Sequence, residues 1–203
     1  MAIGSVNNSS AFTAYSNYVS SSVTLGKSMN RLSTGQKSSM DDSAGVGISE
    51  RMRAQARGTA MARQNVENAI SALQTADSWM QRINDMLTRM SELTIEAQDG
   101  TMGTQDLDNI NSEFEALGDE ILAITSGRGK FNGVNLLDGY TKTTQVGADP
   151  GQVITVTITD LSAIALELDA LTVTGGAAAS AGIKITSAID IVANARAAAG
   201  GLQ

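Results

Sequence analysis

Two rows of apolar residues recur every seven positions inside a long stretch without proline. Ser43 to Gln98 contains no proline. From position 66 onwards, one row is Val66, Leu73, Met80 and Leu87, and the other is Ala69, Ala76, Ile83, Met90 and Ala97. These are the a and d positions of a heptad repeat, along which a helix packs against a partner helix. The rows predict one helix over residues 43–98, about 80 Å long at 1.5 Å per residue.

A second pair of heptad rows follows after a short loop that contains Gly100 and Gly103. It predicts a helix over residues 104–126, ended by Gly127 and Gly129. A loop of about five residues favours antiparallel neighbours. The expected packing seam consists of Val66, Leu73, Met80, Ile83, Leu87, Met90, Leu107, Phe114, Leu117 and Ile121.

The character of the sequence changes after position 130. Asn132-Gly133 and Asp149-Pro150-Gly151 are turn signals. Residues 153–159 are β-branched and alternate isoleucine or valine with threonine, and residues 145–147 offer a paired strand. We therefore expect a β-hairpin region over 131–174. The fold class is mainly α with a small β region: long antiparallel coiled-coil-like helices plus β-hairpins.

The first 40 residues are rich in Ser and Asn and form a weak candidate helix. Tyr15 and Met29 share one seven-residue register, and Tyr18, Leu25 and Leu32 share another. Helix propensity is low at Ser, Thr, Asn and Gly, so such a helix is marginal alone and needs a partner. Asp41 and Asp42 supply N-cap signals for the next helix. We expect four parts: 1–40, 41–130, 131–174, and a last helix over 175–203 that is cut short.

Composition removes several classes of protein. The chain has 203 residues, a net charge of −7, and neither cysteine nor histidine. Disulfides, thiolate or histidine zinc sites and Ser-His-Asp triads are therefore impossible. The acidic balance argues against nucleic acid or an anionic membrane as partner. The apolar runs are too short for a transmembrane span, and no secretory signal peptide is evident.

No catalytic motif is present either. Gly26-Lys27-Ser28 lacks the earlier glycine of a phosphate-binding loop. The paired carboxylates, such as Glu113/Glu115 and Asp119/Glu120, are neighbours on a predicted helix and point in different directions. We expect no catalytic, cofactor-binding or metal-binding residues, no cofactor, and no enzymatic activity.

Several stretches resemble, in order and over nearly the whole chain, the N-terminal and central part of bacterial flagellins. They are Leu32-Ser33-Thr34-Gly35, residues 41–58 (DDSAGVGISERMRAQARG), residues 68–76 (NAISALQTA), residues 87–93 (LTRMSEL), residues 131–139 (FNGVNLLDG), residues 145–148 (QVGA), and Ala195-Arg196-Ala197 with Leu202-Gln203.

The resemblance implies a structural subunit of the flagellar filament that self-assembles into a helical tube for swimming motility. Residues 1–40 would be the inner-tube helix and its connection, 41–130 the helical part of the outer-tube domain, and 175–203 the start of a truncated C-terminal return helix. The implied partners are other flagellin subunits, the type III flagellar export apparatus, and the hook-associated and cap proteins. The implied location is secreted, in the extracellular flagellum.

The resemblance also implies a surface that a host Toll-like receptor recognises. Arg89, Leu93 and Glu113 match family positions in that surface, whereas Thr88 stands where receptor-active members usually have Gln.

Two other functions remain open at this point. A hook–filament junction protein of the same superfamily shares the N-terminal pattern. A short, flagellin-like adaptor that does not polymerise would fit a chain without the C-terminal helices.

Overall fold

The computed structural model describes residues 8–37, 42–169, 171–174 and 176–202. The chain forms two compact units, Met1–Arg57 and Gly58–Gln203, which are described separately. Among the described helices, none is both long enough and apolar enough to cross a membrane. The mainly helical fold with two small antiparallel strand pairs confirms the predicted fold class.

The first unit contains helix α1, Ser9–Thr34. The Asn8 side chain caps its start by accepting a hydrogen bond from the Ala11 N–H at 3.1 Å. Gly35 ends it with a φ of 65°, a left-handed conformation that glycine adopts at no steric cost, and its N–H donates to the Arg31 carbonyl. The helix has no buried residue. Its stability therefore cannot come from packing inside the unit.

Helix α2 covers Ser43–Glu96. Asp42 Oδ1 accepts a hydrogen bond from the Gly45 N–H at 2.8 Å, which is the N-cap expected for this carboxylate. The other cap candidate, Asp41, lies outside the described residues. None of the side chains from Ser43 to Met61 is buried. The first turns of α2, which precede the heptad rows that begin at Val66, therefore contribute no buried side chain.

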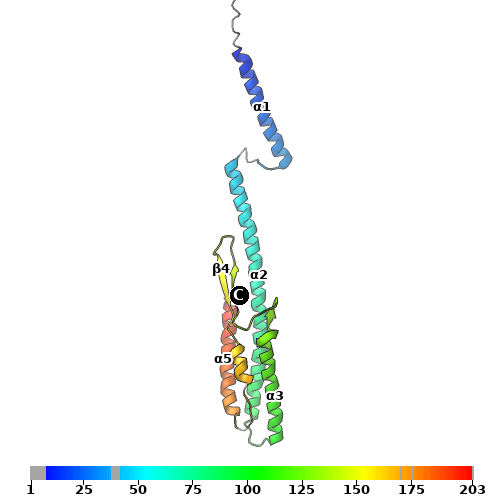
Figure 1. Ribbon diagram of the computed structural model, residues 1–203, viewed down its shortest axis with the longest axis vertical. Helices are drawn as coiled ribbons and strands as arrows, with labels where there is room; N and C mark the ends of the chain where they lie inside the picture. Colours follow the sequence, from blue (N-terminus) through cyan, green and yellow to red (C-terminus); the bar gives the residue numbers. More distant parts are fainter. Residues whose placement is uncertain (1–7, 38–41, 170, 175, 203) are drawn as a thin grey trace, which may run out of the picture. The chain divides into compact units, whose positions relative to one another are not determined.

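The second unit is a helical bundle. The later part of α2 lies beside α3, Thr104–Ala123, and α5, Ala178–Gly201, and runs antiparallel to both (Figure 1). One apolar cluster joins the helices, and Trp79 packs against its edge. The Arg196 guanidinium of α5 donates to the Asp77 carboxylate of α2 at 2.8 Å. Because a charged hydrogen bond favours the charged forms, this contact raises the pKa of Arg196.

The end of α3 continues into a short π-helical turn, η1, Ile124–Arg128. Strands β1, Lys130–Phe131, and β2, Val134–Asn135, follow as a tight antiparallel hairpin. Its two turn residues, Asn132 and Gly133, both have positive φ, as the Asn-Gly signal predicts. Asn135 Nδ2 donates to the Thr125 carbonyl at 2.7 Å, which ties the hairpin to η1.

A second hairpin pairs β3, Thr141–Gln145, with β4, Val153–Thr157. Of the alternating apolar residues, Val156 and Ile158 are buried but Ile154 is half exposed. The hairpin loop packs against α2 at Gly58, where an added Cβ would lie 2.9 Å from the Ala148 Cβ. The absence of a side chain at Gly58 is therefore what allows this close approach.

Helix α4, Ser162–Asp169, was not expected from the sequence. It lies within residues 131–174, for which only hairpins were predicted. Asp160 Oδ1 accepts from the Ser162 N–H at 2.8 Å and so caps its start, and hydrogen bonds from the Ser162 side chain and its N–H lower the pKa of the Asp160 carboxyl. Leu161 and Leu168 are buried, and α4 contacts both α3 and α5. Burial of Leu168 against the neighbouring helices, together with the Asp160 cap, explains the helix.

The close approach at Gly58 leads to a first prediction. Gly58→Ala should lower the midpoint of thermal unfolding, because the new methyl group must displace the hairpin loop. This loss should outweigh the helix-propensity gain of about 1 kcal/mol. Thermal unfolding followed by circular dichroism measures the midpoint of the variant and of the parent chain. Gly47→Ala, also in α2 but with no atom within 4 Å of its added Cβ, is the matched control and should not destabilise. Equal effects at the two positions would show that the contact with Ala148 is not restrictive.

Candidate interaction surfaces

All residues of the expected packing seam lie in the second unit, where each is either fully or partly buried. Leu73, Met80, Ile83, Leu87, Met90, Phe114 and Ile121 are each at most 1% exposed. Val66, Leu107 and Leu117 are partly buried. Of the partly buried members, Leu107 lies in the first turn of α3, Leu117 lies between Phe114 and Ile121, and Val66 precedes the fully buried seam residues of α2. The seam is thus the internal core of one chain, not a surface for a partner.

The heptad spacing of α2 continues from Val66 towards its N-terminus. Stepping back alternately by four and three residues leads through Ala62 and Thr59 to Met52 and Ile48. Ala62 is buried, but Met52 is 65% exposed and Ile48 is 48% exposed. Ile48 and Met52 thus have the spacing of a packing seam, but no helix among the described residues covers them.

Helix α1 has the largest exposed apolar surface among the described elements. At 100° per residue, its large apolar side chains fall on one half of the helix, where Ser22, Asn30 and Ser33 lie among them, and its threonines, its two basic residues and its other serines fall on the other half. The eight side chains are 42–90% exposed: Phe12, Tyr15, Tyr18, Val19, Val23, Leu25, Met29 and Leu32. A continuous exposed apolar face of this kind is typical of a protein–protein contact.

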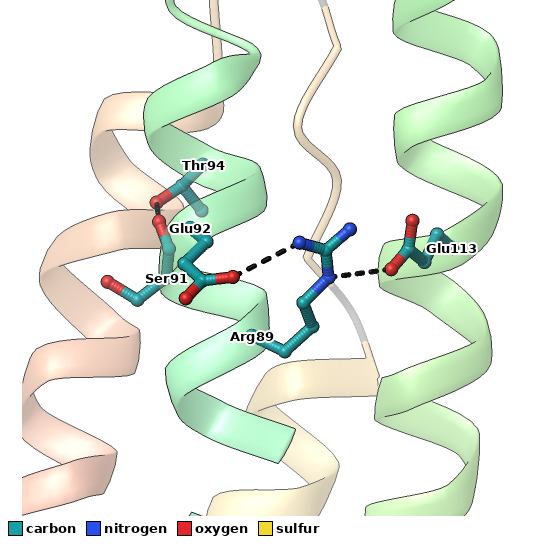
Figure 2. Close-up of polar contacts among 5 residues, drawn as sticks. All are labelled: Arg89, Ser91, Glu92, Thr94 and Glu113. Atoms are coloured by element: carbon teal, nitrogen blue, oxygen red, sulfur yellow. Dashed lines mark hydrogen bonds and ion pairs between the residues drawn. The ribbon is translucent and has the colours of Figure 1, made fainter. Parts of the chain in front are cut away.

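A cluster of charged side chains bridges α2 and α3. Figure 2 shows the Arg89 guanidinium between two carboxylates, with Nε 2.8 Å from Glu113 and Nη1 3.1 Å from Glu92. The hydrogen bond that Arg89 donates to Glu113 is the main cause of a raised pKa of Arg89, and the same bond lowers the pKa of Glu113 below its ordinary value of 4.5. All three side chains are close to half exposed or more. The cluster therefore presents an ordered ion pair to solvent.

The third residue of the expected receptor surface lies elsewhere. Leu93 is 1% exposed and packs in the core of the bundle. One position further along α2, the buried Thr94 donates its hydroxyl to the Ser91 carbonyl at 2.7 Å (Figure 2). Of Arg89, Leu93 and Glu113, only the two charged residues offer side chains to a partner.

The hollows of the second unit do not suggest catalysis. One of about 430 Å³ lies between α2 and the β3–β4 hairpin and is lined by amide, hydroxyl and apolar side chains, without a charged group. In the part of the chain that the structure describes, no three carboxylates gather as a metal site. The exposed apolar face of α1 and the exposed ion pair at Arg89 are therefore the candidate sites for association with a partner.

The sequence of this chain can now be compared with known proteins. Residues 6–142 match the family model for the bacterial flagellin N-terminal helical region. The chain belongs to the bacterial flagellin family. It is 40% identical to a flagellin of Shigella flexneri over 158 residues, which are 76% of this chain and 28% of that protein. It is 36% identical to a flagellin of Serratia marcescens over 203 residues, which are 96% of this chain and 58% of that protein.

A solved flagellin has a similar fold. The crystal structure of Bacillus cereus flagellin matches with a TM-score of 0.62 and 28% identity, over 68% of this chain and 81% of that one. Against the two curated flagellins above, however, the chain spans only 28% and 58% of their length. The flagellin fold and family are therefore shown, whereas the function of a whole flagellin is a proposal for this chain.

The ion pair at Arg89 gives a prediction about pH. Because the pKa of Glu113 is lowered in the folded chain, its contribution to stability is present above pH 4.5 and lost as the pH falls through that lowered value. Glu113→Gln should therefore cost stability at pH 7, by no more than about 1 kcal/mol for so exposed a pair. The difference from the parent chain should vanish near pH 2. Thermal unfolding at both pH values is the measurement.

Glu96→Gln is the control, since Glu96 is exposed and has no ion pair with any described residue. It should change little at either pH. A Glu113→Gln effect that is as large at pH 2 as at pH 7 would contradict an electrostatic origin.

Proposed function

We propose that this chain is a structural subunit of the bacterial flagellar filament and self-assembles into a helical tube. Its membership of the flagellin family supports the proposal. The observation that carries it is helix α1, whose eight large apolar side chains are all exposed and which has no buried residue. A helix with this composition is marginal alone in water, so it needs a partner to become ordered.

The amount of apolar surface on α1 is what a repeating contact requires. Each fully buried Val, Leu, Phe or Met side chain contributes about 1.5–3 kcal/mol. Ordering a residue costs about 1–2 kcal/mol of backbone entropy, so eight such side chains offset a large part of the cost of ordering the 26-residue helix, in addition to the helix's own hydrogen bonds. Contacts that repeat head to tail without closing produce helical filaments. Burial of the apolar face of α1 would therefore favour contact between copies of the chain.

Negative-stain electron microscopy of the concentrated protein, with and without filament seeds, tests the proposal. Long tubes are the expected result. Monomers alone, under both conditions, would overturn self-assembly by this chain and favour the short adaptor that does not polymerise. Short closed rings would favour the hook–filament junction protein instead.

The proposed location and partners of this chain follow from its membership of the flagellin family. Flagellins form the extracellular flagellar filament, so the proposed location of this chain is outside the cell, after export through the flagellar apparatus. The proposed partners are other subunits and the hook-associated and cap proteins.

Recognition by a Toll-like receptor is a second proposal, supported by the exposed and ordered pair of Arg89 with Glu113. The buried Leu93 would support this surface from below rather than contact the receptor. A receptor reporter assay should give a signal that Arg89→Gln reduces. Silence at saturating parent protein would overturn the proposal.

A further inference from the structure

The charges of this chain are divided unequally between its two units. Residues 1–57 carry six Lys or Arg against three Asp or Glu, a net charge of +3. Residues 58–203 carry eight against eighteen, a net charge of −10. Two regions of opposite sign on one chain attract each other between copies, and that attraction speeds encounter.

The negative charge of the second unit is concentrated on α3. Its 20 residues include six carboxylates and no Lys or Arg. Asp108, Glu115 and Asp119 follow each other at steps of seven and four, which places them on one face of the helix. At 3.6 residues per turn, that face lies about 130° around the helix from the buried side of α3, which includes Phe114 and Ile121.

These three carboxylates are free of local cations. Each is exposed, and none forms an ion pair with a described residue. By contrast, Glu113 and Glu120 on the same helix are already bound to arginines. Asp108, Glu115 and Asp119, the acidic stripe, are therefore the part of α3 whose charge remains available to a partner.

The positive charge of α2 is concentrated near its start. Arg51 and Arg57 are exposed and form no ion pair among the described residues, whereas Arg53 is bound to Glu50 at 3.0 Å. On the helix surface, Arg51 and Arg57 lie on either side of Gly47 and Ala54, which are seven residues apart and exposed, and Glu50, which is bound to Arg53, lies next to Arg57. Small residues between two cations, the basic groove, let a second helix approach closely.

We propose that the basic groove of one copy docks on the acidic stripe of α3 in the next copy. This contact deepens the proposed filament function, on which it rests, because it names the surfaces through which successive copies meet. The two surfaces have opposite charge. At 1.5 Å per residue, Asp108 to Asp119 covers about 16 Å of helix and Arg51 to Arg57 about 9 Å, so the two cations can face two of the three carboxylates. Since the surfaces differ, the contact is head-to-tail and can repeat.

The test uses two full-length variants, each lacking one side of the contact. The first, Arg51→Gln/Arg57→Gln, keeps only the acidic stripe. The second, Asp108→Asn/Glu115→Gln/Asp119→Asn, keeps only the basic groove. Light scattering should show that either variant alone associates at least about tenfold more slowly than the parent chain at low salt. Mixed together, the two can form one charged contact per pair, so the mixture should associate faster than either variant alone.

Control variants change the same number of charges elsewhere. Lys142→Gln/Lys184→Gln matches the basic variant, and Glu96→Gln/Asp138→Asn/Asp190→Asn matches the acidic one, all at exposed positions. Both controls should associate like the parent chain. In 1 M salt, where the Debye length is about 3 Å, the parent should slow towards the rate of the variants.

Two results would overturn the inference in different ways. If the parent chain and both variants associate equally fast at low salt, the charged contact is absent while self-assembly stands. If the parent chain shows no association at any salt concentration, the proposed filament function fails, and this contact fails with it.

Discussion

Replacing Leu87 with Asp should unfold the helical bundle. Leu87 is 0% exposed and lies in the middle of the apolar cluster. A carboxylate there would be buried without a cation or hydrogen-bond donor, at a cost of several kcal/mol. Since 1 kcal/mol shifts the midpoint by about 2–4 °C in a chain of this size, we expect a drop of more than about 10 °C or no cooperative transition. Thermal circular dichroism measures it.

The neighbouring residue provides the control for that substitution. Thr88 is exposed on the same turn of α2, so Thr88→Asp adds the same charge without burying it. Its midpoint should stay close to that of the parent chain, as is usual for surface substitutions. An unchanged melting curve for Leu87→Asp would show that the packing register of α2 is wrong.

The double substitution Leu25→Asp/Met29→Asp should have the opposite pattern. Both side chains are 65% exposed, so the unfolding midpoint of the bundle should not change. Assembly should fail, because each carboxylate would enter the apolar contact that α1 is proposed to make. At several kcal/mol per buried charge, the critical concentration should rise more than about a hundredfold. Sedimentation of polymer from a concentration series is the measurement.

The polar half of α1 supplies a matched control. Ser20→Asp/Thr24→Asp introduces the same charge on the face opposite Leu25. This variant should assemble within about tenfold of the parent concentration, allowing for like-charge repulsion. If both double variants lose assembly equally, charge on α1 is the cause and the apolar face is not.

The helices were predictable where the apolar rows are long and regular. The rows through Leu73 and Leu87 predicted α2 from Ser43 to about Gln98, and the structure ends it at Glu96. The turn at Asn132-Gly133 was also predicted, because these residue types adopt the positive φ that both turn positions require. In each case the deciding information is local, so the sequence carries it.

What escaped prediction depends on contacts between distant segments. Nothing in residues 162–169 alone distinguishes α4 from a strand, since the buried Leu168 becomes apolar core only beside α3. The same holds for Leu93, whose depth depends on which helices cover it. At Gly58, the sequence gives no sign that Ala148, ninety positions later, fills the space of the missing side chain.

The placement of the aromatic residues makes the two units separately observable. The single tryptophan, Trp79, packs on the bundle core, and α1 holds two of the three tyrosines, Tyr15 and Tyr18. Tryptophan emission therefore responds to the bundle alone, whereas most of the tyrosine absorbance belongs to α1. A solution of this chain can be followed without any attached dye: ordering of α1 alters the near-ultraviolet tyrosine bands while the tryptophan spectrum stays constant.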